Sequence, residues 1–230
     1  MTTLFIATRN AHKVGEIAAI LGDGVQCRPL LLEFPTAPVP VEDADTFAGN
    51  ALKKAQALAD WLNAPPALDL RLSAADQAFI LADDSGLEVD ALGGAPGVHS
   101  ARFAALDASQ EGNRPDADNN AKLLRLLADV PPAKRTARFR CVLALVEVEV
   151  DRAVPRLTPQ LFDGACEGWI DSAPRGHGGF GYDPLFIPAG HELSFAELGE
   201  RVKNTLSHRA QALAKLRSWL AEGRPGARPA

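Results

Sequence analysis

Apolar residues recur along this chain at two spacings, one typical of strands and the other of helices. Leu4 to Thr8 is a short apolar run that predicts a buried strand. A polar turn follows it, and helical spacing then runs from residue 13 to residue 21. The second apolar run, Val25 to Leu32, predicts a second strand. The predicted buried face of the helix between the strands consists of Val14, Ile17, Ala18 and Leu21.

Longer elements follow in the middle of the chain. Thr46 is a favourable N-cap for a helix over residues 47–62, and residues 117–127 have the spacing of another helix. Residues 135–150 alternate between apolar and polar, which predicts a long strand with one wet face toward its end. Residues 160–170 are predicted to be its hairpin partner.

Two adjacent carboxylates stand at the centre of the chain. Residues 79–82 form an apolar strand that leads directly to Asp83 and Asp84, followed by Ser85-Gly86 and a second apolar run. Side chains alternate along a strand, and the Ser-Gly pair predicts a turn that would change this arrangement. One acid could then brace the turn while the other projects into a cleft, as an oxygen ligand of the kind that Mg²⁺ accepts. A plain turn with two solvated acids is the alternative.

Basic residues lie near the predicted starts of two helices. Lys13 falls in a first helical turn, where a cation is electrostatically unfavourable unless a bound anion offsets it; a solvated lysine is the alternative. Near the C-terminus, a capping-box pattern at Ser194 and Glu197 predicts a helix start. Basic side chains follow it at Lys203, His208 and Arg209. Clusters of this kind at helix starts are what an anion site requires.

Four glycines over residues 176–181 resemble a phosphate loop in composition only. Tyr182 and Asp183 follow at the position where a P-loop needs Lys followed by Ser or Thr, so the P-loop interpretation fails. The glycines could instead expose the rings of Phe180 and Tyr182 for stacking on a nucleobase, with Asp183 accepting hydrogen bonds from the base. A glycine loop that closes a hairpin is the alternative.

Composition narrows the possible functions. The 230 residues include 24 Lys and Arg against 29 Asp and Glu, a net charge of -5, which argues against binding to long nucleic acid or to an anionic membrane. The three cysteines form no CxxC pair and suit buried thiols in a reducing cytoplasm. No signal peptide or 18-residue apolar run is found. We expect one two-lobed domain over residues 1–222, with an insertion at 63–77 and a disordered tail at 223–230.

Five motifs follow one another along the chain: Thr8-Arg9-Asn10 with Lys13 and Glu16, Thr46-Phe47 with Asn50 and Lys54, the stretch 81–102, GGFGYDP at 178–184 and KNTLSHRAQAL at 203–213. In this order they closely resemble the inosine triphosphate pyrophosphatase family, whose members hydrolyse non-canonical purine nucleoside triphosphates. The resemblance runs from about Leu4 to Leu220, apart from the 63–77 insertion. It implies a homodimeric α/β fold with an elongated mixed sheet, flanking helices and two lobes around a central nucleotide-binding cleft. It also implies a Mg²⁺-dependent reaction that converts dITP, ITP or XTP to the nucleoside monophosphate and pyrophosphate.

The same resemblance assigns roles to individual residues. Asp84 is the expected catalytic acceptor and a metal ligand, and Glu42 is the expected second ligand. Ser85 would help to hold the triphosphate. The residues expected to neutralise the triphosphate are Thr8, Arg9, Asn10, Ala11, His12, Lys13, Lys54 and Lys203. The residues expected to hold and read the base are Phe180, Gly181, Tyr182, Asp183, His208 and Arg209.

This chemistry agrees with the residue types. Hydrolysis at the α-phosphorus needs an in-line water, a cation that bridges phosphate oxygens, and positive side chains that offset the charge of departing pyrophosphate. A hydrogen-bond donor facing a 6-oxo group would be left unpaired by adenine, at a cost of about 1 to 3 kcal/mol. Two rivals remain: a sensor that binds purine nucleotides without hydrolysis, and an enzyme with a different base preference or cleavage position.

Overall fold

The computed structural model describes residues 2–64, 70, 72, 76–107, 112–148 and 157–222. By their internal contacts these fall into two compact units. The first unit comprises Met1–Asp84, Val142–Asp163 and Ala212–Ala230, and the second comprises Ser85–Cys141 and Gly164–Gln211. Several segments lie outside the described residues. They are most of the predicted insertion, residues 108–111, positions 149 and 150 of the long predicted strand, and the whole predicted tail.

A mixed six-stranded sheet runs in the order β2-β1-β3-β4-β5-β6. β1 pairs in parallel with β2 and β3, whereas β5 and β6 are antiparallel. The α/β fold with flanking helices is therefore confirmed. The strands are β1 (Thr2–Ile6), β2 (Gln26–Pro29), β3 (Gln77–Val89), β4 (Thr136–Glu147), β5 (Gln160–Ile170) and β6 (Phe186–Pro188).

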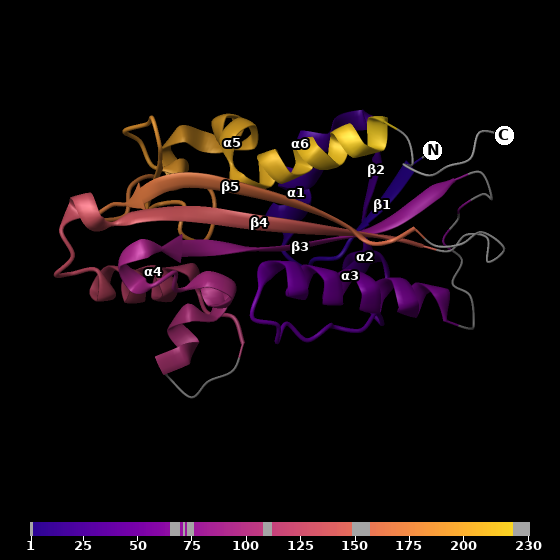
Figure 1. Ribbon diagram of the computed structural model, residues 1–230, viewed down its shortest axis with the longest axis horizontal. Coiled ribbons are helices and arrows are strands. Elements are labelled where there is room, and N and C mark those ends of the chain that lie inside the picture. Colours follow the sequence, from indigo (N-terminus) through magenta and orange to yellow (C-terminus); the bar gives the residue numbers. More distant parts are fainter. Residues whose placement is uncertain are drawn as a thin grey trace. The chain divides into compact units, whose positions relative to one another are not determined.

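The first unit contains β1, β2 and the first part of β3, with helices on both sides of these strands (Figure 1). The predicted first helix begins two residues earlier than expected. The predicted strand over Val25 to Leu32 is wrong beyond Pro29, because proline has no N–H to continue the ladder and α2 begins at the next residue. The helices of this unit are α1 (Ala11–Leu21), η1 (Gly22–Gly24), α2 (Leu30–Glu33), α3 (Phe47–Asn63) and the end of α6 (His208–Ala221).

Helix α3 forms as predicted. The Thr46 side chain caps it by accepting a hydrogen bond from the N–H of Gly49 at 3.0 Å. Its apolar stripe faces the core, where Ala51 and Ala55 are fully buried. On the other side of the unit, Trp219 of α6 makes an edge-on ring contact with Phe79 of β3, at a centroid distance of 6.0 Å.

The predicted turn at Ser85-Gly86 is wrong, because β3 continues as one strand from Gln77 to Val89. β3 lies between β1 and β4 in the sheet, but β1 pairs with it only from Gln77 to Leu81, so β4 is the neighbouring strand of its later part. This pairing overrides the local turn preference of a Ser-Gly pair. As a result, Asp83 and Asp84 occupy ordinary successive strand positions.

The second unit is built around an aromatic and aliphatic core that includes Phe103, Phe139, Phe186 and Phe195. In Figure 1 α4 and α5 lie on opposite sides of the strands of this unit. The predicted capping box at α5 is present in full. The helices here are η2 (Asp90–Leu92), η3 (Gly97–Asp107), α4 (Asp116–Leu126), η4 (Pro132–Lys134), α5 (Phe195–Leu206) and the first turn of α6.

Two details of the long strands differ from, or extend, the sequence prediction. The predicted wet face of the strand is wrong at Glu147, which is only 9% exposed and accepts a hydrogen bond from the N–H of Leu157 at 2.9 Å; Glu149 lies outside the described residues. The close approach of β6 explains why position 168 of β5 is a glycine. A Cβ at this position would stand 2.2 Å from the carbonyl oxygen of Ile187.

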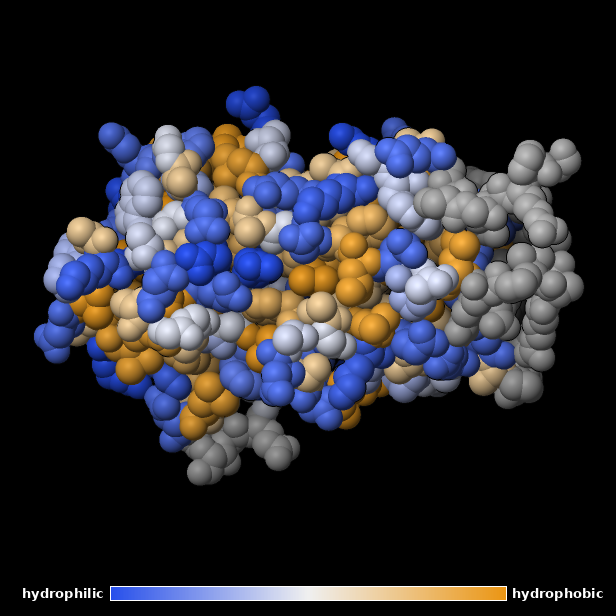
Figure 2. Space-filling view, in the orientation of Figure 1, coloured by the Kyte–Doolittle hydropathy of each residue, from blue (hydrophilic) through white to orange (hydrophobic). Residues whose placement is uncertain are grey.

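The surface is mixed in character, and hydrophilic and hydrophobic residues are interspersed on the face drawn in Figure 2. Among the described residues no helix combines the length and apolar character needed to span a bilayer. None of the three cysteines forms a disulfide; Cys141 and Cys166 are buried, and Cys27 is half-buried. Burial raises the pKa of the Cys166 thiol to about 11, so this thiol stays protonated at neutral pH.

Candidate active site

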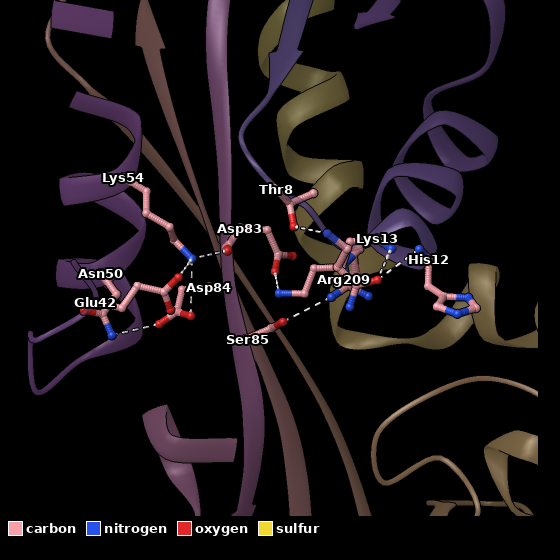
Figure 3. A network of polar contacts seen from close by, with 11 residues as sticks. Thr8, His12, Lys13, Glu42, Asn50, Lys54, Asp83, Asp84, Ser85 and Arg209 are labelled. Atoms are coloured by element: carbon pink, nitrogen blue, oxygen red, sulfur yellow. Dashed lines mark hydrogen bonds and ion pairs between the residues drawn. The ribbon is translucent and has the colours of Figure 1, made fainter. Parts of the chain in front are cut away.

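β3 sends its two acids to opposite faces of the sheet, because successive side chains of a strand alternate. Asp83 meets Lys13 of α1, and Asp84 meets Asn50 and Lys54 of α3 (Figure 3). Both carboxylates are buried, at 2% and 6% exposure. The continuous strand therefore gives each acid a separate set of partners.

The surroundings of Asp84 bring together two acids, an amide and a lysine. Asn50 donates its side-chain N–H to Oδ2 of Asp84 at 3.1 Å. The ammonium of Lys54 lies 3.6 Å from Oδ1 of Asp84 and 3.2 Å from Oε1 of Glu42, and it donates to the main-chain oxygen of Asp83 at 2.8 Å. One buried lysine thus faces two carboxylates and a carbonyl oxygen, so negative charge is in excess.

The pKa of Asp84 is raised above its ordinary value. Burial is the largest cause, because it disfavours the charged form, and the nearby charge of Glu42 acts in the same direction. Lys54, Lys13 and the hydrogen bond from Asn50 oppose the shift. A carboxylate with a raised pKa is a stronger base than an exposed one, which suits it to accept a proton from water.

The predicted site residues Glu42, Lys54 and Asp84 are therefore brought together within the first unit. Asn50 was not assigned a role from the sequence, although it is fully buried at the centre of this cluster. Its oxygen also accepts the N–H of Ala44 at 2.9 Å, so it ties the segment that follows Glu42 to Asp84. The sequence feature that could have indicated a role for Asn50 is its position four residues before Lys54, which puts both residues on one helical face.

At the N-terminus of α1, where the sequence predicts a bound anion or a solvated lysine, the structure supplies partners within the protein. Asn10 caps the helix, and its side-chain oxygen accepts the N–H groups of His12 at 2.9 Å and Lys13 at 3.3 Å. The N–H of Asn10 itself donates to the hydroxyl of Thr8 at 3.1 Å. The buried carboxylate of Asp83 supplies the negative partner that Lys13 needs in a first helical turn. Arg9, Ala11 and His12 are exposed on the same turn.

A second group of predicted residues gathers in the second unit. Arg209, only 1% exposed, donates to the hydroxyl of Ser85 at 3.1 Å, and its guanidinium carbon lies 5.8 Å from the ring centroid of Phe180. The ammonium of Lys203 lies 4.4 Å from the same centroid. Lys203 also donates to Oδ2 of Asp183 at 2.6 Å, inside the protein. The half-buried ring of Phe180 is thus bordered by two cations.

The structure corrects the expected exposure of Tyr182. Its ring belongs to the core of the second unit, it is 3% exposed, and its hydroxyl donates to the main-chain oxygen of Ser100 at 2.9 Å. Asp183 is equally buried and accepts the N–H of Phe180 at 2.8 Å. His208 is 4% exposed and stacks on Phe139 at a centroid distance of 4.8 Å. Of the two predicted stacking rings, Phe180 alone is partly accessible.

The residues around Asp84 fit a bound Mg²⁺ ion. Within the part of the chain that the structure describes, no group of three or more His, Cys, Asp or Glu is arranged to hold a metal. Magnesium in nucleotide sites takes only one or two protein carboxylates, with water and phosphate as its other ligands. Asp84 and Glu42 supply that pair, and their mutual repulsion, seen in the raised pKa of Asp84, would be relieved by a cation.

Known proteins similar to this chain agree with one another. The Ham1 family matches residues 4–219. The dITP/XTP pyrophosphatase of Geobacillus kaustophilus strain HTA426 is 46% identical over 217 residues, covering 94% of this chain and 93% of that protein. The corresponding protein of Geobacter sulfurreducens is 46% identical over 221 residues, covering 96% and 97%. The structure of a HAM1 protein from Coxiella burnetii superposes with a TM-score of 0.75 at 37% identity, covering 97% and 100%.

Proposed function

Because the chain belongs to the Ham1 family, we propose that it hydrolyses non-canonical purine nucleoside triphosphates such as dITP and XTP. The products are the nucleoside monophosphate and pyrophosphate, so the enzyme removes these nucleotides from the pool. The resemblance first drawn from the sequence motifs is confirmed at the level of the family. Proteins named dITP/XTP pyrophosphatase that match this chain over nearly its whole length support the choice of substrate.

The observation that carries the proposal is the raised pKa of the buried Asp84 beside a lysine and a second acid. In the ionised state Asp84 accepts a proton from water as the water oxygen forms a bond to the α-phosphorus. The bond between the α-phosphorus and the bridging oxygen breaks, and pyrophosphate leaves. Lys54 offsets the charge that develops on phosphate oxygens during this step.

The polar turn from Thr8 to Lys13 is proposed to bind the triphosphate chain. Arg9 and His12 are exposed there and can reach phosphate oxygens without breaking a buried contact. Lys13 contributes positive charge while its partner Asp83 holds it in place. A bidentate guanidinium such as that of Arg9 suits phosphate geometry better than a point charge does.

Mg²⁺ is the proposed cofactor, held by Asp84 and Glu42. When bound, it would polarise phosphate oxygens and neutralise part of the triphosphate charge. Lys54 keeps the two carboxylates close together, with its ammonium within 3.6 Å of both. Asn50 holds one oxygen of Asp84 and so orients the carboxylate.

Phe180 and Arg209 are proposed to recognise the base in the second unit. The partly exposed ring of Phe180 offers a stacking face, and the guanidinium of Arg209 can donate to a 6-oxo group. Adenine carries an amino group at that position and would leave the donor unpaired. Lys203 and Asp183 support this arrangement from inside the protein, and His208 stacks on Phe139 of the same unit.

Phosphorus NMR of the products formed from dITP and, separately, from dATP tests the reaction and the base preference together. Equal active-site concentrations are used with Mg²⁺, and an Asp84→Asn preparation controls for contaminating pyrophosphatases. We expect pyrophosphate and dIMP from dITP, with dATP nearly untouched. Inorganic phosphate with dIDP would instead identify a phosphatase, and stoichiometric binding without turnover would identify a nucleotide sensor.

Homodimerisation and a cytoplasmic location are further parts of this proposal. Three cysteines that form no disulfide are consistent with a reducing compartment. Sedimentation equilibrium of the purified chain would decide the assembly state. A mass of one chain at micromolar concentration would contradict the dimer.

A further inference from the structure

Helix α4 holds both main-chain polar groups of a single glycine in the base-recognition loop. The N–H of Gly181 donates to Oδ2 of Asp116 at 2.6 Å, and the carbonyl oxygen of Gly181 accepts from the side-chain amide of Asn120 at 3.0 Å. Asp116 and Asn120 are four residues apart in α4, so they lie on one face of the helix. Gly181 has a φ of +64°, a left-handed conformation that it can adopt without steric cost.

We propose that Asp116 and Asn120 are positioning residues that set the base specificity of this enzyme. They hold Gly181 in one conformation and thereby fix the ring of the preceding residue, Phe180. Neither side chain touches the base in this scheme. The inference rests on the proposed function, because it takes Phe180 as the face on which the purine stacks.

The connection from Gly181 to Phe180 runs through one rigid peptide plane. The N–H of Gly181 and the carbonyl of Phe180 belong to the same planar peptide unit. That carbonyl accepts the N–H of Asp183 at 3.3 Å, and the N–H of Phe180 donates to the Asp183 carboxylate at 2.8 Å. Rotating the plane away from Asp116 would therefore also disturb the bonds that place Phe180 beneath Lys203.

Packing gives this loop little support on the side of α4. A pocket of about 440 Å³ lies there, and both Phe180 and Gly181 line it together with Asp116 and Asn120. Apolar walls of the pocket come from Leu124 and other residues of the same region. Because side chains do not fill this volume, directional hydrogen bonds to the backbone are what can hold the loop in place.

Asn120 is an unfavourable choice for stability alone. The residue is 8% exposed, and its side-chain oxygen has no hydrogen-bond partner among the described residues. A buried acceptor without a partner destabilises the fold, and an apolar side chain of similar size would avoid this loss. The presence of an amide here is explained by its donation to Gly181.

Three variants separate positioning from stability: Asn120→Leu, Asp116→Ala and Asp116→Asn. The readout is the ratio of kcat/KM for dITP to kcat/KM for dATP. A change in the fraction of folded enzyme alters both constants equally and cancels from this ratio. We expect Asn120→Leu and Asp116→Ala to lower the ratio roughly two- to tenfold, the range that follows from losing one intramolecular hydrogen bond. Asp116→Asn keeps an acceptor oxygen and should retain the ratio.

Asp118→Ala is the matched control, since Asp118 lies in the same first turns of α4 and pairs with Arg114 at the surface. Its ratio should equal that of the unaltered enzyme. Amide hydrogen exchange at Gly181 supplies a readout independent of catalysis, and it should be faster in Asp116→Ala than in Asp116→Asn. Unchanged ratios with slow exchange in all variants would overturn the inference. Absence of dITP turnover in the unaltered enzyme would instead overturn the proposed function, and the exchange result would then still test the contact.

Discussion

Replacing Asn50 by alanine should alter the pH dependence of catalysis, because Asn50 links two parts of the Asp84 cluster. Its side-chain N–H donates to Asp84 at 3.1 Å, and its oxygen accepts the N–H of Ala44 at 2.9 Å. Asn50 is fully buried, so in the variant the Asp84 carboxylate and the N–H of Ala44 each lose a hydrogen bond inside the protein. The change removes no charge, and Asn50 itself is not proposed to contact the substrate.

The expected change in the pKa of Asp84 follows from its hydrogen bond with Asn50, compared between the ionised and the protonated carboxyl group. A bond to a charged group contributes about 1.5 to 3 kcal/mol and a neutral one about 0.5 to 1.5, so ionised Asp84 loses about 1 kcal/mol more than protonated Asp84. This difference corresponds to a roughly fivefold higher proton affinity. Burial already raises the pKa of Asp84, and the hydrogen bond from Asn50 opposes that shift. Its removal therefore moves the acidic limb of the activity profile to higher pH.

The assay is kcat/KM for dITP as a function of pH, with saturating Mg²⁺ in an overlapping buffer series. Asn50→Ala should lose more activity on the acidic limb of the profile than on its plateau, and its free energy of unfolding should fall by about 1 to 3 kcal/mol. Gln56→Ala is the matched control, because this amide on the same helix bonds Asp60 at 2.9 Å away from the site. An Asn50→Ala profile that parallels the unaltered enzyme at every pH would refute the reasoning.

Three further changes test the acid pair and the sheet. Asp84→Asn should lower kcat for dITP by at least ~10²-fold in steady-state assays. The pKa of Asp84 is higher in the folded protein than in the unfolded chain, so ionised Asp84 destabilises the fold once the pH has risen through that pKa. The Tm of Asp84→Asn at pH 7.5 without metal should therefore be no lower than that of the unaltered enzyme. Near-normal turnover by Asp84→Asn would contradict the catalytic role of Asp84. Burial is the largest cause of the raised pKa of Asp84, and the charge of Glu42 also raises it. Glu42→Gln removes that charge, so the acidic limb of the rate profile should move to lower pH. A move to higher pH would argue against this effect of Glu42. Gly168→Ala brings a methyl group 2.2 Å from the Ile187 oxygen and should cost roughly 1 to 3 kcal/mol in urea unfolding, whereas Gly24→Ala, with open space, should not; equal losses would be inconsistent with this contact.

The sequence by itself determined features that depend on neighbours within a few positions. The cap from Thr46 to Gly49 and the capping box of Ser194 and Glu197 each join residues three apart, so local chemistry sufficed to predict them. Apolar spacing likewise predicted α3. The motifs together identified the family, because their order along the chain needs no knowledge of contacts.

Tertiary structure decided the partners of the charged and aromatic residues. Lys13 lies 70 positions from Asp83, so the sequence offered a bound anion or solvent for its charge but could not show the buried carboxylate that the fold places beside it. Tyr182 lies 82 positions from Ser100, whose carbonyl oxygen draws its hydroxyl into the core. No pattern among neighbouring residues indicates a contact between residues so far apart in the sequence.

The central strand shows the physical reason most directly. Ser85-Gly86 has a local preference for a turn, but β3 is paired with β1 up to Leu81 and continues unbroken to Val89 next to β4. Ladder hydrogen bonds to neighbours distant in sequence outweigh a two-residue turn preference. That outcome sends Asp83 toward α1 and Asp84 toward α3, so the backbone geometry gives two adjacent acids different partners, which the residue types alone do not determine.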